Sequence, residues 1–256
     1  MEYSLNEKVA LVTGSTSGLG KAIAIEFAKK GAMVIVSGRR SDEGQNVVNE
    51  INSSFTGKAS FFKCDVSNLT EVKNLLEFTI NTFGKLNFGI NNAAIGGEMK
   101  KLADYSIEEY QKVIDINLNG TFYCMKFEIP ELLKTKGCIV NVSSIGGHRG
   151  QKHGIAPYSA TKHGIIGLTK CAALEYGEQG VRINAICPAG METEMNEKLY
   201  SQYPDPEKAK KERDKAYALG RIANPIEVAK TVVWLCSDEA SFITGTAIPV
   251  DGGKTA

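Results

Sequence analysis

The chain has 256 residues, of which 43% are hydrophobic and 23% charged, the proportions of an ordinary globular protein large enough for a well-formed core. Its formal charge of +1 at pH 7 gives no surplus of positive charge with which to bind nucleic acid or an anionic membrane. A small molecule is therefore the expected partner.

The first residues and the cysteines indicate a cytoplasmic protein without a metal. The opening stretch, MEYSLNEKVALVTG, has acidic and polar residues where a signal peptide would have basic and apolar regions, and no apolar run approaches a membrane span. The six cysteines include no Cys-x-x-Cys spacing and each lies in an apolar context. This pattern favours buried free thiols over disulfides or a metal site.

Short apolar runs alternate with longer helical patterns along the whole chain. The predicted strands cover Val9–Val12, Met33–Val36, Ala59–Phe62, Leu86–Asn91, Cys138–Val142, Val181–Ile186 and Ala247–Val250. The predicted helices cover Gly18–Lys30, Ser41–Ser53, Leu69–Phe83, Ile107–Lys134, Pro157–Tyr176 and Pro225–Cys236. This alternation predicts a single α/β domain over residues 1–256, with a doubly wound parallel sheet of about seven strands and helices on both faces.

The segment between Pro188 and Arg221 is the irregular part of the pattern, because Tyr203-Pro204-Asp205-Pro206 interrupts a charged, partly helical stretch. A solvated surface insertion would have this composition. Mobile segments at the carboxyl ends of parallel strands also cover ligand pockets. We predict a substrate lid at about residues 190–220.

A glycine-rich stretch, TGSTSGLG at residues 13–20, follows the first predicted strand and opens the first predicted helix. In that context Gly14 permits a tight turn, Gly18 lets the backbone approach a pyrophosphate, and Gly20 allows close packing of helix on strand. A tight turn without a ligand could use the same glycines, but their place between strand and helix favours dinucleotide binding.

The end of the second predicted strand, VIVSGRR at residues 34–40, bears on which dinucleotide is bound. An acidic residue there would hold a ribose 2′-hydroxyl and repel a 2′-phosphate. Gly38 stands at that position and leaves room, and Arg39 or Arg40 can pair with a dianionic phosphate. We therefore expect NADP(H) to be preferred, with NAD(H) as the alternative.

The third and fourth predicted strands are also followed by candidate ligand-binding residues. Asp65, in Cys64-Asp65-Val66, can cap the following turn or accept a hydrogen bond from an adenine amino group, and the sequence leaves both roles open. The short side chains of Asn91-Asn92-Ala93-Ala94 let the backbone come close to a ligand.

Tyr158 and Lys162 are the candidate catalytic pair. They lie four residues apart on a predicted helix, so their side chains project from one face. A nearby ammonium favours phenolate over phenol and lowers the phenol pKa from about 10 toward neutrality. Exposed helices often carry such pairs without any catalytic role, so the rest of the chain must supply the context.

That context is a series of motifs in a fixed order. They are T-G-x-x-x-G-x-G at 13–20, Asp65-Val66, Asn91-Asn92-Ala93-Ala94, Asn117, Ser143-Ser144, Tyr158-x-x-x-Lys162, Asn184-Ala185-x-x-Pro188 and Thr244-Gly245…Asp251-Gly252-Gly253. In these motifs, over nearly its whole length, the chain resembles a short-chain dehydrogenase/reductase of the compact single-domain branch. It is similar to 3-oxoacyl-[acyl-carrier-protein] reductases and glucose dehydrogenases. The resemblance implies a Rossmann fold and NAD(P)-dependent hydride transfer between nicotinamide C4 and a carbonyl or secondary alcohol carbon, without a metal.

The resemblance also implies catalytic roles. Tyr158 would be the general acid in ketone reduction and the general base in alcohol oxidation, while Lys162 would lower its pKa and bind the nicotinamide ribose. Ser144 would polarise the substrate carbonyl, and Asn117 would position a water that relays protons from Lys162. Residues 145–157 separate Ser144 from Tyr158, one residue more than in many relatives, so Ser143 stays an alternative for the acting hydroxyl.

The resemblance implies cofactor contacts along the same edge of the sheet. Ala94 and Ala189 replace the family's usual glycines near this cofactor, each adding one methyl group. His148 and His153, in the loop at the substrate mouth, are weaker candidates for substrate contacts. The residues expected to contact the cofactor are Gly14, Ser17, Gly18, Leu19, Gly20, Arg39, Arg40, Asp65, Val66, Asn92, Ala93, Tyr158, Lys162, Pro188 and Thr193.

Substrate, rival function and assembly are the least specified features. A 3-oxoacyl-[acyl-carrier-protein] is one candidate substrate, weakened by Gln179 where carrier-protein reductases often have arginine, and a free ketone, sugar or cyclic alcohol is another. A non-catalytic dinucleotide-binding sensor or scaffold could use the same fold. The helices Ile107–Lys134 and Pro157–Tyr176 have broad apolar faces, and relatives pair these helices, so we expect a homotetramer or at least a dimer.

Overall fold

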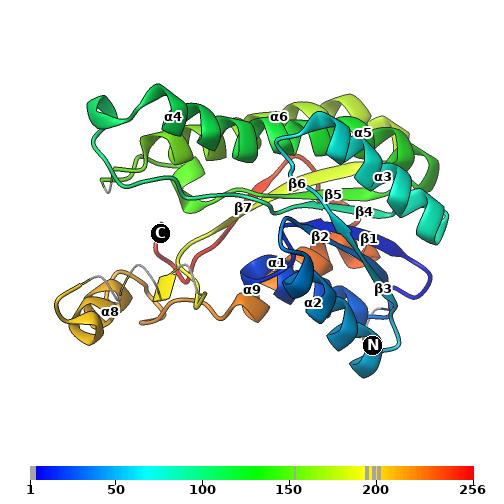
Figure 1. The fold of residues 1–256 in the computed structure, drawn as a ribbon, viewed down its shortest axis with the longest axis horizontal. Helices are drawn as coiled ribbons and strands as arrows, with labels where there is room; N and C mark the ends of the chain where they lie inside the picture. The colour runs from blue at the N-terminus through cyan, green and yellow to red at the C-terminus, as the bar shows by residue number, and fades with distance from the viewer. Residues whose placement is uncertain (1–3, 153, 194–195, 198–199, 201–202) are drawn as a thin grey trace.

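The computed structural model describes residues 4–152, 154–193, 196–197, 200 and 203–256. A parallel sheet of seven strands runs through it in the order β3-β2-β1-β4-β5-β6-β7 (Figure 1). The strands are β1 Val9–Thr13, β2 Met33–Gly38, β3 Ala59–Lys63, β4 Phe88–Asn91, β5 Cys138–Val142, β6 Arg182–Pro188 and β7 Ala247–Val250. The predicted fold class is therefore confirmed.

Helices cover both faces of the sheet, as Figure 1 shows, with α1, α2 and α9 on one face and α3, α4, α5 and α6 on the other. This coverage explains why the central strands are continuous apolar runs, since β1 and β5 are buried at every position. The helices are α1 Gly18–Lys29, α2 Ser41–Ser54, α3 Leu69–Phe83, α4 Ile107–Ile114, α5 Gly120–Thr135, α6 Ala156–Tyr176, α8 Pro206–Asp214 and α9 Pro225–Cys236.

The helix predicted over Ile107–Lys134 is divided into two α-helices in the structure. Between α4 and α5 the chain makes a π-helical turn over Asp115–Asn119. The side chain of Asn117 within this turn is completely buried and bonds the backbone of Ile95 on both its amide and its carbonyl. A π-turn inserts an extra residue into a helix, and such turns are frequent at functional sites.

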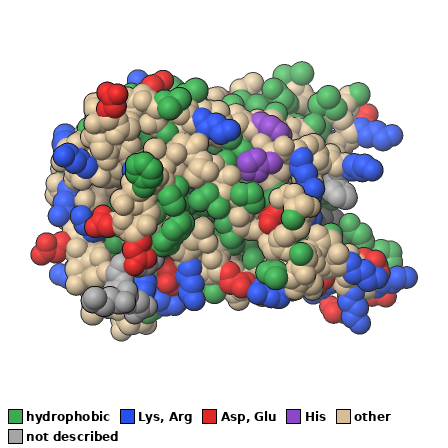
Figure 2. Space-filling model, turned by 180° about the vertical axis from the view of Figure 1, so that it is seen from behind, with side chains coloured by type: hydrophobic (Ala, Val, Ile, Leu, Met, Phe, Trp, Pro, Cys, Tyr) green, Lys and Arg blue, Asp and Glu red, His purple; other side chains and the backbone are tan. Residues whose placement is uncertain are grey.

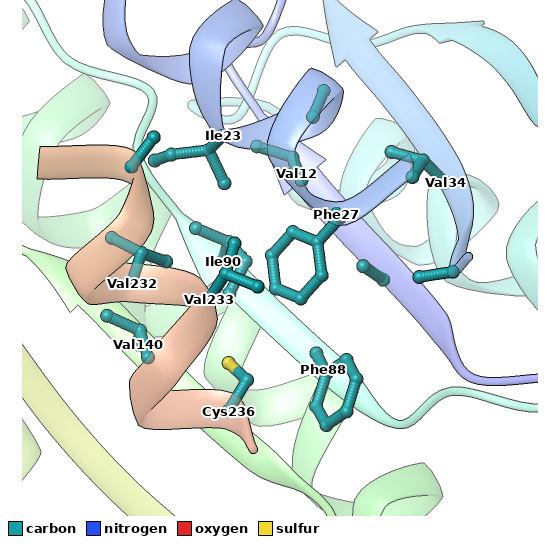
Figure 3. Close-up of a cluster of buried hydrophobic side chains, with 14 of the residues drawn as sticks. Val12, Ile23, Phe27, Val34, Phe88, Ile90, Val140, Val232, Val233 and Cys236 are labelled. Atoms are coloured by element: carbon teal, nitrogen blue, oxygen red, sulfur yellow. The ribbon is translucent and has the colours of Figure 1, made fainter. Parts of the chain in front are cut away.

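Two apolar layers hold the helices on the sheet. In the layer between the sheet and α1 and α9, Phe27 stacks on Phe88 with ring centroids 5.6 Å apart, and Val232 and Val233 of α9 face Ile23 and Val12 (Figure 3). The other layer lies under α3, α5 and α6 and includes Leu11, Ile35, Leu75, Leu132 and Ile139. Burial on both faces makes the sheet a rigid support for the loops at its carboxyl edge.

The cysteines and the hydropathy of the helices bear on two expectations from the sequence. The cysteines are free thiols, and all but Cys171 are buried. Cys171 lies at an exposed position of α6, so the prediction that it is buried was wrong. Its apolar neighbours in the sequence did not reveal that it faces outward. Among the described residues, none of the helices combines the length and the apolar character that crossing a bilayer requires.

Candidate active site

The glycine-rich stretch forms a tight loop between β1 and α1 in which two glycines have no room for a side chain. Gly14 has φ 64°, and a Cβ there would lie 2.7 Å from Cα of Ala93. A Cβ on Gly20 would collide with the carbonyl oxygen of Gly14 and would lie 2.5 Å from Nδ2 of Asn92. Gly20 therefore packs the start of α1 against the loop and Asn92, rather than against a strand as the sequence suggested.

The open side of this loop fits the phosphate groups of a dinucleotide. Gly18 has φ 55°, and a Cβ there would meet only the methyl group of Thr193, at 3.8 Å. Ser17 occupies the N-cap of α1, but its side chain makes no capping hydrogen bond. The first N–H groups of α1, which are natural donors to an anion, are thus not covered by the residue best placed to cap them.

Asn92 and Thr13 hold the loop to the end of β4. The Asn92 side chain donates to the carbonyl oxygens of Thr13 and Gly14, at 3.0 and 3.1 Å. Thr13 Oγ1 accepts from the backbone N–H groups of Asn92 and Ala93, at 3.1 and 3.2 Å. The sequence predicts that the backbone of Asn92 and Ala93 comes close to the cofactor. The structure adds the two hydrogen bonds from the Asn92 side chain to the loop, which the sequence did not predict.

The arginines after β2 lie beside the same loop. Arg40 donates through Nη2 to Thr16 Oγ1 at 3.1 Å and to the hydroxyl of Ser17. A Cβ on Gly38 would lie 2.8 Å from the methyl carbon of Thr16. The sequence predicts that Gly38 leaves room because it replaces an acidic residue. In the structure the side chain of Thr16 fills that room, and nothing in the sequence indicated this contact.

Arg39 and Asp65 border a surface cleft of about 550 Å³, whose other lining residues include Ser67, Ile107, Gln111 and Ile116. Nη1 of Arg39 lies 3.9 Å from Oδ2 of Asp65. Oδ1 of Asp65 accepts from the backbone N–H and the hydroxyl of Ser67, at 3.0 and 2.7 Å. Asp65 thus does cap the turn that follows β3, and its other oxygen faces Arg39 at the cleft.

Tyr158 and Lys162 lie side by side near the N-terminal end of α6, with Nζ of Lys162 5.5 Å from the centroid of the Tyr158 ring. Lys162 is only 2% exposed. Its Nζ donates to the carbonyl oxygen of Val142, the last residue of β5, at 2.7 Å. Burial lowers the pKa of Lys162 to about 8.

The pKa of Tyr158 moves in the direction opposite to the one predicted from the sequence. Burial of the phenol raises its pKa, and a hydrogen bond with the hydroxyl of Ser144 lowers it only in part. The prediction rested on the ammonium of Lys162 next to the ring. Burial of the phenol acts in the other direction, because phenolate, like any charged form, is disfavoured away from water.

The two serines after β5 have different surroundings. Ser144 bonds Tyr158, and its Oγ lies 3.5 Å from the carbonyl oxygen of Pro188. Ser143 is 3% exposed, and its hydroxyl donates to the carbonyl oxygen of Lys162 at 2.9 Å. Ser144 thus lies beside the phenol, while Ser143 fastens α6 to the sheet.

Asn117 lies next to this group but uses its side chain for structure. Its Oδ1 accepts from Ile95 N at 2.9 Å, and its Nδ2 donates to Ile95 O at 2.9 Å and to Thr161 Oγ1 at 3.3 Å. The amide therefore braces the loop after β4 against α6.

The sequence did not single out Cys187, which also belongs to this group. Burial raises the pKa of its thiol, and Ser143 and Lys162 lower it. It is a buried residue of β6 directly before Pro188. A cysteine in an apolar strand gives no sign in the sequence that it will face an active site.

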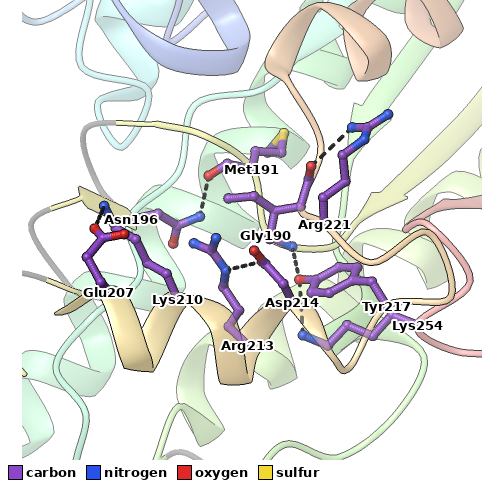
Figure 4. Close-up of polar contacts among 11 residues, drawn as sticks. Gly190, Met191, Asn196, Glu207, Lys210, Arg213, Asp214, Tyr217, Arg221 and Lys254 are labelled. Carbon is purple, nitrogen blue, oxygen red and sulfur yellow. Dashed lines mark hydrogen bonds and ion pairs between the residues drawn. The ribbon is translucent and has the colours of Figure 1, made fainter. Parts of the chain in front are cut away.

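The predicted lid segment is anchored at both ends (Figure 4). The hydroxyl of Tyr217 accepts from Gly190 N at 2.9 Å and from Nζ of Lys254 at 3.1 Å. Met191 forms a parallel bridge with Ala223. Thr193 lies over Gly18, so the segment begins directly above the phosphate loop.

The two described histidines, His148 and His163, do not join this constellation. His163 is exposed, and its Nδ1 lies 2.9 Å from the carbonyl oxygen of Ser159, one turn earlier on α6. His148 is exposed at the end of the short turn after Ser144. His153 lies outside the described residues.

Comparisons with known proteins find dehydrogenases and reductases that match nearly the whole chain. A family model described as enoyl-(acyl carrier protein) reductase matches residues 14–255. Cyclohexanol dehydrogenase of Acinetobacter sp. (strain SE19) is 41% identical, over 100% of this chain and 98% of that protein. The 3beta-hydroxysteroid dehydrogenase of Mediterraneibacter gnavus is 40% identical, over 98% of this chain and 95% of that protein. The crystal structure of levodione reductase superimposes with a TM-score of 0.92 at 32% identity, covering 99% of this chain and 98% of that one.

The loop geometry yields a prediction about Gly20→Ala. The added methyl group has to displace Gly14 and Asn92, and because overpacking costs about 1–3 kcal/mol, the affinity for NADPH should fall about tenfold or more. A fluorescence titration with NADPH measures this. Gly167→Ala is the matched control, since a Cβ on Gly167 of α6 meets nothing within 4 Å. Equal affinities for the two variants would show that the Gly20 packing does not shape the phosphate site.

Proposed function

The chain belongs to the short-chain dehydrogenase/reductase family, and on that basis we propose how its residues share the reaction. It is an oxidoreductase that acts on alcohols and ketones. The nicotinamide cofactor, when bound, supplies or accepts the hydride. The observation that carries our assignment is the contact of Tyr158 with both Ser144 and Lys162 at the carboxyl edge of the sheet.

In ketone reduction, the phenol of Tyr158 donates its proton to the carbonyl oxygen, and in alcohol oxidation the same oxygen accepts the hydroxyl proton. A raised pKa keeps the phenol protonated at neutral pH, which suits the donor role. The Ser144 hydroxyl donates to the substrate oxygen as negative charge develops there, so it stabilises the transition state more than the ground state.

Lys162 and Asn117 support this proton transfer. With a pKa of about 8, Lys162 can hold or release a proton near the pH of the reaction, and its position beside Tyr158 suits binding of the nicotinamide ribose. Asn117 positions the loop after β4 and, through Thr161, the catalytic turn of α6. The water relay that the family resemblance implies for Asn117 stays a prediction.

For the substrate, we favour a secondary alcohol or ketone carried on a ring. Two relatives are named for cyclohexanol and for the 3β-hydroxyl of a steroid, and both match this chain over nearly its full length. A carrier-bound 3-oxoacyl thioester has no specific support, and Gln179 lacks the positive charge that an acidic carrier would favour. The sensor hypothesis has no observation in its favour, since the phenol, the ammonium and the hydroxyl are placed together.

For the cofactor, we favour NADP(H) over NAD(H), with the phosphate loop, Asn92, Ala93, Pro188 and Thr193 along its length. The support is Arg40, whose guanidinium lies beside Thr16 and Ser17 at the start of α1, where a 2′-phosphate would add an acceptor. Arg39 and Asp65 would border the adenine in the cleft of about 550 Å³.

Three further expectations accompany this function. The segment at about 190–220, of which residues 194–195, 198–199 and 201–202 lie outside the described residues, would act as a lid over the substrate; the support is that Thr193 lies over Gly18 and that the hydroxyl of Tyr217 accepts from Gly190 N. Residues 1–256 would act as one domain, since a single sheet organises them. A cytoplasmic location also stays a prediction.

A homotetramer is the assembly we propose, with a dimer as the alternative. Large apolar side chains are exposed on this chain, among them Leu174 on α6 at 85% and Phe242 before β7 at 104% of full exposure. Figure 2 shows apolar side chains gathered near the centre of one face, with charged side chains around them. Large exposed apolar side chains that gather on one face favour association.

Tyr158→Phe tests the catalytic assignment. Loss of the proton donor should lower kcat for NADPH-dependent ketone reduction by about a hundredfold to ten-thousandfold. Ser144→Ala should lower kcat by about a hundredfold to a thousandfold, and Ser143→Ala by far less, because its hydroxyl bonds the backbone of Lys162. The measurement is cofactor oxidation with a panel of cyclic ketones. A Tyr158→Phe variant as active as wild type would remove this residue from the mechanism.

Arg40→Gln tests the cofactor preference. Losing a charged hydrogen bond to the 2′-phosphate costs about 1.5–3 kcal/mol, so KM for NADPH should rise about tenfold or more while KM for NADH stays close to its wild-type value. Lys134→Gln, which removes an exposed cation on α5 paired with Glu131, is the control. A wild-type enzyme with a lower KM for NADH than for NADPH would contradict the preference.

Light scattering tests the assembly. The scattering mass should be near four times that of one chain, and Leu174→Glu should lower it, because the new charge would be buried in the contact. Leu69→Glu, at a less exposed position of α3, should leave the mass unchanged. A wild-type protein that scatters as a monomer at micromolar concentration would overturn the proposal.

A further inference from the structure

The interior contains a carboxyl group that the reaction does not use. Glu128 of α5 is 0% exposed. Its carboxyl group lies against Gly89 of β4, where a Cβ would come within 2.6 Å of the carboxyl carbon. Burial raises the pKa of Glu128 to about 7, and its hydrogen bond with Asn91 lowers it. An absent side chain on β4 therefore makes room for an acid deep in the core.

Glu128 and Asn91 share one hydrogen bond and each keeps one oxygen unused. Nδ2 of Asn91 donates to Oε2 of Glu128 at 2.9 Å. Oε1 of Glu128 and Oδ1 of Asn91 are both buried without a hydrogen-bond partner among the described residues. A carboxylate cannot satisfy Oδ1, because both groups only accept. A single proton on Oε1 would satisfy both atoms at once.

The orientation of the Asn91 amide is fixed by its other neighbour. Nδ2 of Asn91 also donates to Oδ1 of Asn141 at 3.0 Å, and Nδ2 of Asn141 donates to Oγ1 of Thr169 at 2.9 Å. A reversed Asn91 amide would turn its oxygen toward two acceptor oxygens. The N–H groups of Asn91 therefore stay directed at Glu128 and Asn141, and Oδ1 is the oxygen left without a partner among the described residues.

We propose that Glu128 is a neutral carboxylic acid whose O–H donates to Oδ1 of Asn91, closing a two-bond ring, and that this ring positions the two halves of the active site. The inference rests on the proposed function, since Asn91 lies between those halves. Glu128 is in this sense a positioning residue and does not touch substrate or cofactor.

Two chains of contacts lead from the ring to the site. Asn91 is followed directly by Asn92, whose amide holds the carbonyl oxygens of Thr13 and Gly14 in the phosphate loop. On the other side, Asn141 pairs with Asn91 in the β4–β5 register and is followed by Val142, which accepts from Lys162.

The catalytic helix completes the second chain. Thr169, the partner of Asn141, lies on the same helix as Tyr158 and Lys162 and donates to Ile165 O at 2.8 Å. Loss of the Glu128 proton would leave two acceptor oxygens facing each other and would loosen both connections.

Among the described residues, the titratable groups that interact with Glu128 offer no positive charge to stabilise a carboxylate. Cys124 lies one turn earlier on α5, and its pKa is raised by burial and by Glu128. Cys64, after β3, faces Cys124, and burial raises the pKa of its thiol to about 12. Both groups are neutral or, if ionised, negative, so they favour the protonated acid.

Infrared spectroscopy of the whole enzyme tests the protonation directly. The difference spectrum between wild type and Glu128→Gln at about pH 6 should contain the carbonyl stretch of a protonated carboxylic acid, which should be lost as the pH rises through the raised pKa. Glu26→Gln is the matched control, because Glu26 is also buried but has Nζ of Lys29 at 3.8 Å, and it should show no such band. A carboxylate band for Glu128 at about pH 6 would overturn the proposal.

Kinetics of two variants test the positioning. Glu128→Gln can close the same ring through its carboxamide at every pH, so its kcat should match wild type at about pH 6 and exceed it increasingly toward about pH 9. Glu128→Leu removes the ring and leaves the Asn91 amide with Asn141 as its remaining partner, so its kcat should fall about tenfold or more with a smaller change in KM. A wild-type to Glu128→Gln ratio that is constant with pH, or a Glu128→Leu variant with wild-type kcat, would contradict the positioning role.

These readouts separate the inference from the proposed function. The infrared band needs no substrate, so its absence would remove the protonated acid while leaving the oxidoreductase assignment intact. If Glu128→Leu fails to fold, the infrared measurement and Glu128→Gln still decide. A wild-type enzyme inactive toward every carbonyl compound would instead remove the function while the band remained.

Discussion

The hydrogen bond from the buried ammonium of Lys162 to the carbonyl oxygen of Val142 is the interaction on which the site depends. It joins the catalytic helix α6 to the last residue of β5 at a point where both are buried. A lysine ammonium loses most of its hydration there, so a strand carbonyl has to replace water. Ser143 reinforces the same junction by donating to the backbone of Lys162. Ser144, the next residue, is then held beside Tyr158.

The glycine-rich loop after β1 depends on close approach between backbones rather than on charge. Gly14 and Gly20 allow β1, α1 and the end of β4 to meet at distances that any Cβ would prevent. Asn92 then spans the gap with two hydrogen bonds. Since β1 and β4 are neighbours in the sheet, this contact also sets the distance between the phosphate loop and the catalytic helix across β5.

Patterns that depend on local spacing could be predicted from the sequence, and patterns that depend on what a side chain meets could not. The alternation of strands and helices and the four-residue spacing of Tyr158 and Lys162 are local, and both appear in the structure. The choice between Ser143 and Ser144 needed the path of the chain after β5. The pKa direction of Tyr158 failed because burial is a property of the assembled fold. Thr16 and Tyr217 gave no signal because their partners lie 24 and 27 residues away.

Glu128 and Lys162 show that this interior resists charge of either sign. The pKa of Glu128 is raised from 4.5 to about 7, so the folded state binds more protons than the unfolded state in that window and stability falls as pH rises through it. The pKa of Lys162 is lowered from 10.5 to about 8, so the unfolded state binds more protons above about pH 8 and stability rises again with pH. The two contributions are therefore least favourable near neutral pH. The apolar layers on both faces of the sheet offset this loss of stability.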